Sequence, residues 1–145
     1  MYTPQMVING TNGFIGSDGN LAHKYINQNL QIPASNKITL NIKTNDSKQI
    51  EVSYYCGQLT PDTVLNFALV ERGLESDVTR GENAGHLLKH DNVVREFKNI
   101  PLTQKDGVIS FAKPTTYDPI RFSVISYLQN TTDMKVVAAD SIDLM

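Results

Sequence analysis

Cysteine is nearly absent from this chain, because Cys56 is the only one among 145 residues. A single thiol excludes an internal disulfide, a four-cysteine zinc site and a dithiol redox pair, each of which needs at least two thiols. No basic residue stands next to Cys56 in the sequence to lower its pKa. We therefore predict that Cys56 is a small buried apolar side chain rather than a nucleophile, and we expect no cofactor.

The sequence also lacks an excess of positive charge and a long apolar run. Its 13 basic residues stand against 15 acidic ones, so the basic patch typical of nucleic-acid-binding domains is not expected. No segment approaches the roughly 18 apolar residues that would span a bilayer. The N-terminus has neither the basic start nor the apolar centre of a signal peptide. If Met1 is the native start, these features predict a cytoplasmic protein.

The first 32 residues predict a strand, a second strand and a helix. Residues 5–9 and 14–16 flank the sequence NGTNG, whose residues tolerate tight turns. Ser17 or Asp18 is a suitable helix N-cap. Apolar residues then follow at helical spacing, namely Leu21, Ala22, Tyr25, Ile26 and Leu30.

From residue 37 onward, apolar and polar residues alternate, which predicts strands. The residues expected to point inward include Ile38, Leu40, Ile42, Ile50, Val52 and Tyr54. The segment TVLNFALVER is apolar on both faces and predicts a central strand. Seven or eight such strands separated by turns favour an antiparallel β-sandwich over residues 37–145. We therefore predict a mainly β fold, α+β overall, with a domain boundary in the linker QIPASN at residues 31–36.

Aromatic residues are spread over the predicted strands at alternating positions, as in the core of a sandwich. The set expected in that core is Tyr54, Tyr55, Phe67, Phe97, Phe111, Phe122 and Tyr127.

Two stretches, YTPQMVINGTNGFIGSD and RGENAGHLLKHDNVVREF, resemble DUF1223, a bacterial family of unknown function. The resemblance implies a thioredoxin-like first half, a β-rich second half and a periplasmic or secreted location. It places Thr3 and Pro4 where thioredoxin-like folds have a cis-proline before a hairpin and a terminal helix. Residues 1–32 would then be the C-terminal part of such a fold, without the earlier half and its Cys-x-x-Cys motif.

This resemblance implies that the strand at residues 5–9 has an open edge. In a thioredoxin-like fold that strand would pair with an inner strand of the earlier half, and an unpaired edge invites another chain. The chain is a fragment of a longer protein, one half of a split protein, or a protein whose copies pair edge to edge. The expected partner at this edge is accordingly the missing half or a second copy.

Two groups of residues are candidates for binding. If the family keeps the thioredoxin-like groove, Thr3 and Pro4 line a site where an added strand pairs with the backbone. The loop RGENAG can turn tightly at its glycines and would present Arg80, Glu82 and Asn83. We expect Glu82 to pair with Arg80 or Arg95, which would make this loop either a binding loop or a self-bonded structural one.

His86 and His90 are candidate metal ligands. If GHLLKHD is helical, the two imidazoles share one face at i and i+4, with Asp91 or Glu82 as a third ligand. If His90 instead belongs to the following strand, the pair is separated. The alternative to metal binding is one hydrogen-bonded histidine and one exposed histidine.

Three functions remain open at the level of the sequence. The chain is a non-catalytic interaction module; or it is part of a thiol–disulfide oxidoreductase whose Cys-x-x-Cys half lies outside it; or it binds a metal through His86 and His90. We favour the first, because the chain has one cysteine and no recognisable catalytic motif.

Overall fold

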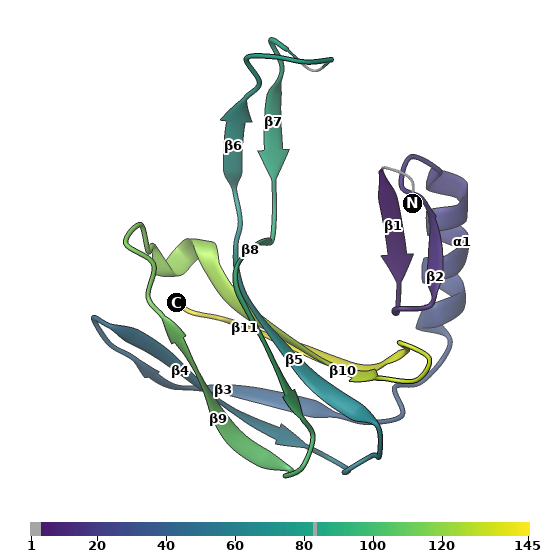
Figure 1. The fold of residues 1–145 in the computed structure, drawn as a ribbon, viewed down its shortest axis with the longest axis vertical. Helices are drawn as coiled ribbons and strands as arrows, with labels where there is room; N and C mark the ends of the chain where they lie inside the picture. The colour runs from purple at the N-terminus through teal and green to yellow at the C-terminus, as the bar shows by residue number, and fades with distance from the viewer. Residues whose placement is uncertain (1–3, 83) are drawn as a thin grey trace.

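Two antiparallel sheets packed face to face form the body of the molecule in a computed structural model, which describes residues 4–82 and 84–145. A four-stranded sheet has the order β11–β10–β5–β8, and a three-stranded sheet has the order β3–β4–β9 (Figure 1). The strands are β3 (Ile38–Asn45), β4 (Gln49–Cys56), β5 (Thr63–Glu71), β8 (Val93–Pro101), β9 (Asp106–Ala112), β10 (Phe122–Asn130) and β11 (Val136–Asp143). The predicted mainly β, antiparallel fold is confirmed.

The core lies between the two sheets and is built from alternate residues of each strand. On β5, Leu65, Phe67 and Leu69 are fully buried there, and β5 is the central strand that its apolar sequence predicts. Opposite them, the three-stranded sheet contributes Ile50, Val52 and Tyr54, as the alternation in β4 indicates. Phe67 contacts Tyr54 across the core with ring centroids 5.4 Å apart.

Four residues expected in the core lie outside it. Tyr55 and Phe97 are about half exposed, at 50% and 49%. Successive side chains of a strand point to opposite faces, and these two point to the outer faces of their sheets. Ile42 is 36% exposed although it lies opposite the buried Val52, and the register of β3 and β4 shifts directly after it. Tyr127 is partly buried, opposite Asn66 on the outer face of the four-stranded sheet.

A two-stranded hairpin, which we call the arm (residues 74–90), projects from the sandwich between β5 and β8 (Figure 1). It consists of β6 (Leu74–Asp77) and β7 (Leu87–His90), paired antiparallel. The alternation in the sequence is too short at both strands to predict them. The helix on which the two-histidine metal site depends does not form, because residues 87–90 are extended.

The N-terminal segment consists of β1 (Gln5–Ile8), β2 (Asn12–Ile15) and α1 (Gly19–Leu30), in the predicted order. Asn9 and Gly10 have positive φ angles of 49° and 78°, as the sequence NG favours in a tight turn. Asp18 caps α1 by accepting a hydrogen bond from the N–H of Leu21 at 3.0 Å. A short 3-10 helix, η1 (Pro119–Arg121), leads into β10. Within the described ranges, no helix is both long and apolar enough to cross a membrane.

We predict that Phe67→Ala lowers the free energy of unfolding by about 3–5 kcal/mol, because it opens a cavity in the centre of the core. Phe97→Ala is the matched control and should cost less than about 1 kcal/mol, since this ring is half exposed. Urea unfolding followed by circular dichroism measures both. Equal losses for the two variants would contradict the assignment of inner and outer faces.

Candidate interaction site

Strand β1 has one paired edge and one open edge. The N–H of Gly16 donates to the C=O of Pro4 at 2.8 Å. This bond shows which residues of β1 are hydrogen-bonded to β2, since such positions alternate along an antiparallel pair. In this alternation the backbone groups of Met6 bond to β2, whereas those of Gln5 and Val7 point to the opposite side. Among the residues described, only β2 pairs with β1. Gln5 and Val7 therefore present free donors and acceptors for another strand.

The hairpin β1–β2 is apolar on both faces. On one face Phe14 is buried against Tyr25 of α1, with ring centroids 5.4 Å apart. On the other face Val7 and Ile15 are 52% and 53% exposed. Apolar residues on both faces are typical of a strand that is covered on two sides, as in a layered α/β sheet. The face of Val7 and Ile15 is therefore suited to cover from a further element.

The turn of this hairpin packs against the β10–β11 turn of the sandwich. The C=O of Asn9 accepts a hydrogen bond from the N–H of Val136 at 2.9 Å. Gly10 lies so close to the β10–β11 turn that a Cβ there would stand 1.9 Å from the carbonyl oxygen of Met134. Only glycine fits at this contact, at a φ angle that also favours glycine. The edge of β1 is thus occupied at Asn9 and open at Gln5 and Val7.

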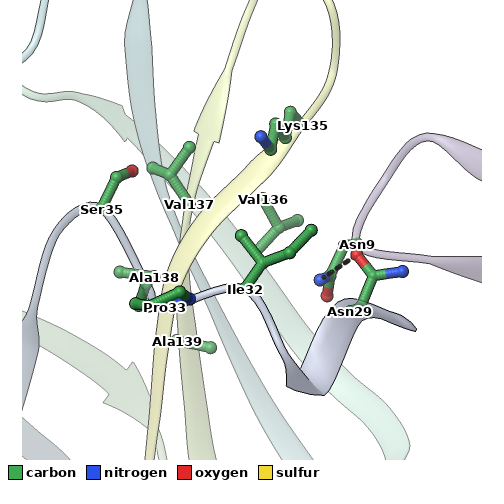
Figure 2. Close-up of a pocket in the computed structure, with 11 residues that line it drawn as sticks. Asn9, Asn29, Ile32, Pro33, Ser35, Lys135, Val136, Val137, Ala138 and Ala139 are labelled. Carbon is green, nitrogen blue, oxygen red and sulfur yellow. Dashed lines mark hydrogen bonds between the residues drawn. The ribbon is translucent and has the colours of Figure 1, made fainter. Parts of the chain in front are cut away.

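A small pocket of about 230 Å³ lies at the same junction (Figure 2). Its walls are the linker at Ile32 and Pro33, residues 136–139 of β11, and the side chains of Asn9 and Asn29. At one end of the pocket the amide of Asn9 donates to Asn29 at 2.9 Å, and Asn29 in turn donates to the C=O of Tyr25 (Figure 2). These contacts join the turn to the helix, and the bond from Val136 to Asn9 joins the turn to the sandwich, so the pocket lies where these packed parts meet.

A cluster of charged residues holds the base of the arm. The carboxylate of Glu71, at the end of β5, is 3% exposed and receives two bonds from Arg95, at 2.7 Å and 2.8 Å. Arg121 lies 3.3 Å from its other oxygen. The sequence suggested Glu82 as a partner of Arg80 or Arg95, but Arg95 pairs with Glu71 instead. A buried carboxylate is stable only with such partners.

Arg121 links this cluster to the residues that lead into the arm. Arg121 donates to the carbonyl oxygens of Arg72 and Gly73, each at 3.2 Å. Across the arm, Asp91 accepts a hydrogen bond from the N–H of Gly73 at 2.9 Å. Arg72 pairs with Asp143 of β11 at 2.5 Å. The first strand of the arm is therefore fixed to the sandwich at Arg72 and Gly73, and the second is held to the first through Asp91.

The two histidines lie in different environments. His90 is the last residue of β7, and its Nε2 is 2.9 Å from the Oγ of Ser76 on β6. His86 is exposed at the tip of the arm. The i and i+4 arrangement on one helix face is therefore wrong. In the described part of the chain, no group of three His, Cys, Asp or Glu residues could hold a metal ion.

The remaining candidate binding residues are only partly described. Thr3 and Asn83 lie outside the described residues. Pro4 is exposed beside the open edge of β1, and Arg80 and Glu82 are exposed in the loop at the tip of the arm. A binding role for these residues stays a prediction. The open edge itself extends the site to Gln5 and Val7, which the alternation of backbone bonds identifies once the register is known.

Cys56 has no exposed surface and belongs to the core between the sheets. Burial raises the pKa of its thiol above the ordinary value. The prediction of a buried apolar side chain is confirmed, and a protonated, enclosed thiol is poorly suited to nucleophilic attack.

These features define the class of the protein: a mainly β, antiparallel sandwich with a strand–strand–helix extension whose edge is open. A family described as "Protein of unknown function (DUF1223)" matches residues 1–129. The chain belongs to this DUF1223 family, which confirms the resemblance seen in the sequence. The family match does not test the thioredoxin-like half or the bacterial source, and both stay predictions.

Among solved structures, the chain is similar to a domain of the outer membrane lipoprotein Omp28 from Porphyromonas gingivalis. The identity is 14% and the TM-score 0.48, over 77% of this chain and 96% of that one. It is also similar to part of the β-glucosidase from Kluyveromyces marxianus, with 10% identity and a TM-score of 0.37, over 77% of this chain and 14% of the enzyme. These likenesses concern the fold alone. No curated protein matches the chain.

We predict that Glu71→Gln loosens the arm and lowers the free energy of unfolding by about 1–3 kcal/mol, because two arginines lose their shared carboxylate. Hydrogen exchange of the amides in β6 and β7 should rise with it. Glu75→Gln is the matched control, since Glu75 pairs with Lys89 only at 3.8 Å on the exposed arm. Unchanged exchange in Glu71→Gln would mean that the cluster does not hold the arm.

We predict that Cys56 in the folded chain reacts with a soluble aromatic disulfide reagent at least roughly a hundredfold more slowly than in urea, because the core must open first. The absorbance of the released thiolate measures both rates. Comparable rates in the folded and unfolded chain would contradict the burial of this thiol.

Proposed function

We propose that this chain is a non-catalytic interaction module, in which a β-sandwich presents the open edge of β1 to a strand of a partner. The observation that carries the proposal is the outward backbone of Gln5 and Val7, which pairs with no other described strand, in a hairpin that is apolar on both faces. A two-stranded hairpin of this kind is marginal alone, and strand addition supplies both hydrogen bonds and cover.

The partner that fits this edge is a thioredoxin-like half, as the family resemblance implies. The strand–strand–helix order of residues 5–30 is the order that such a fold has at its C-terminal end. An inner strand of the partner would bond to Gln5 and Val7, and one of its helices would cover Val7 and Ile15. Pro4 would then lie at the beginning of the shared sheet, and the family resemblance assigns Thr3 and Pro4 to the groove.

The condition of Cys56 supports a module without catalysis of its own. Its thiol is enclosed in the core and its pKa is raised by burial. Under the oxidoreductase alternative, the reactive thiols would therefore belong to the partner, and this chain would contribute one side of the groove. Metal binding has less support, because His90 already contacts Ser76 and lies apart from the helical arrangement that a two-histidine site needs.

A periplasmic or secreted location is part of the same proposal. It follows from the family resemblance, and it requires a leader that directs the protein out of the cytoplasm. Fractionation of cells that produce the protein from its own gene would test the location independently of the partner.

The strand-addition role is tested by placing a photo-crosslinking amino acid at Gln5 in the protein produced from its own gene. We expect a crosslink to a thioredoxin-like polypeptide, identified by mass spectrometry of the joined peptides. Val7→Pro should abolish it, because proline removes the outward N–H without breaking a bond to β2. Val7→Thr keeps that N–H and should preserve the crosslink.

Two results would contradict this role. The absence of any crosslink from Gln5 would mean that the edge has no partner. A crosslink to a second copy, together with a dimer by light scattering that Val7→Pro dissociates, would assign the edge to self-association.

A further inference from the structure

The outer face of the four-stranded sheet carries an uncharged patch. Three rows of directly opposed residues cross β8, β5 and β10 there. The rows are Val94–Val70–Ser123, Phe97–Ala68–Ile125 and Asn99–Asn66–Tyr127. Since opposed residues share one face of a sheet, these nine side chains lie together and turn away from the core. We call them the outer patch.

The outer patch combines buried and exposed apolar residues. Ala68 and Val70 are 6% and 2% exposed, although neither belongs to the core between the sheets. Val94 and Phe97, on the edge strand beside them, remain 53% and 49% exposed. A contiguous apolar surface of this kind marks a place where another surface docks.

Asn66, in the centre of the outer patch, points to the same conclusion independently. The residue is 3% exposed, and within residues 4–82 and 84–145 its side-chain Nδ2 has no hydrogen-bond partner. Its main-chain oxygen accepts a hydrogen bond from Ser126 Oγ at 2.9 Å. A buried amide donor without an acceptor is destabilising unless a partner supplies one.

The N-terminal segment and the arm both rise from the side of the sandwich formed by the four-stranded sheet (Figure 1). Within the segment, β1 lies on the side turned toward the arm, and α1 lies on the far side (Figure 1). A strand added to the open edge of β1 therefore extends the hairpin toward the arm. A folded body that supplies this strand would lie above the outer patch.

We propose that the thioredoxin-like body that pairs with β1 also docks on the outer patch, with an apolar surface over Phe97 and Ala68 and a carbonyl acceptor at Asn66. The inference rests on the proposed function. Because the nine residues of the patch carry no charge, the complementary surface is uncharged too. A lone extended peptide satisfies the edge of β1 but leaves the patch uncovered, so the occupant is a folded body.

The test uses the photo-crosslinking amino acid at Phe97, in parallel with Gln5. We expect both positions to join the same thioredoxin-like polypeptide. Tyr55 is the matched control, because it is equally exposed but lies on the outer face of the other sheet, and it should give no such product.

The outcomes separate the two proposals. If Gln5 crosslinks and Phe97 does not, or joins a second copy or a different polypeptide, docking on the outer patch is wrong and strand addition stands. If Gln5 itself fails to crosslink, strand addition is wrong and the docking inference falls with it. A crosslink from both positions to one body supports both.

The affinity of the complex identified through Gln5 provides a second readout. Phe97→Asp should raise its Kd by about tenfold or more, and Tyr55→Asp should change it by less than about twofold. Asn66→Asp, which replaces the donor by an acceptor, should also weaken the complex, with the fold checked by circular dichroism. An unchanged Kd in Phe97→Asp would overturn the inference even if Asn66→Asp does not fold.

Discussion

The rest of the structure depends on the double pairing of β5, which is hydrogen-bonded along its length to β8 on one side and to β10 on the other. Side chains on both faces of this strand are buried, Phe67 in the core and Val70 within the outer patch. The arm is inserted between β5 and β8, so its position is set by where these two strands end. Glu71, the last residue of β5, then fixes the arm through Arg95 and Arg121. The sandwich is thus a rigid frame for the elements that project from it.

Two edge strands of the described structure, β9 and β1, differ in how their outer backbone groups are covered. At β9, the carboxylate of Glu96 accepts the N–H of Ala112 at 3.1 Å, and Lys98 donates to the carbonyl oxygen of Ser110. Charged side chains of this kind satisfy an edge and keep other strands away. At β1, the outward groups of Val7 have no such cover among the described residues, and the flanking side chains are apolar. This contrast is why we interpret β1 as an edge that receives a strand.

The sequence predicts the sandwich well because its signal is local. Alternation places Ile50 and Val52 in the core wherever a strand keeps its register, and the NG turn of the first hairpin follows from two residues that tolerate positive φ angles. It fails where an outcome depends on distant residues. Phe97 is exposed because the register between β8 and β5 places it on the outer face. The same register brings Arg95 next to Glu71, with which it pairs. The sequence does not predict the arm, because its strands are too short for alternation to be distinguished from helical spacing.

The open edge and the outer patch are also consequences of long-range pairing, and they reinforce each other physically. Strand addition at Gln5 and Val7 alone would order a partner through few hydrogen bonds, at a cost in conformational entropy that short edges barely offset. Contact with the patch around Asn66 adds apolar burial and removes an unpaired donor at no further translational cost, because the partner is already held. Two weak surfaces that face the same body therefore act as one binding site. The two surfaces can act together because the close contact of Gly10 with the β10–β11 turn fixes the hairpin to the sandwich.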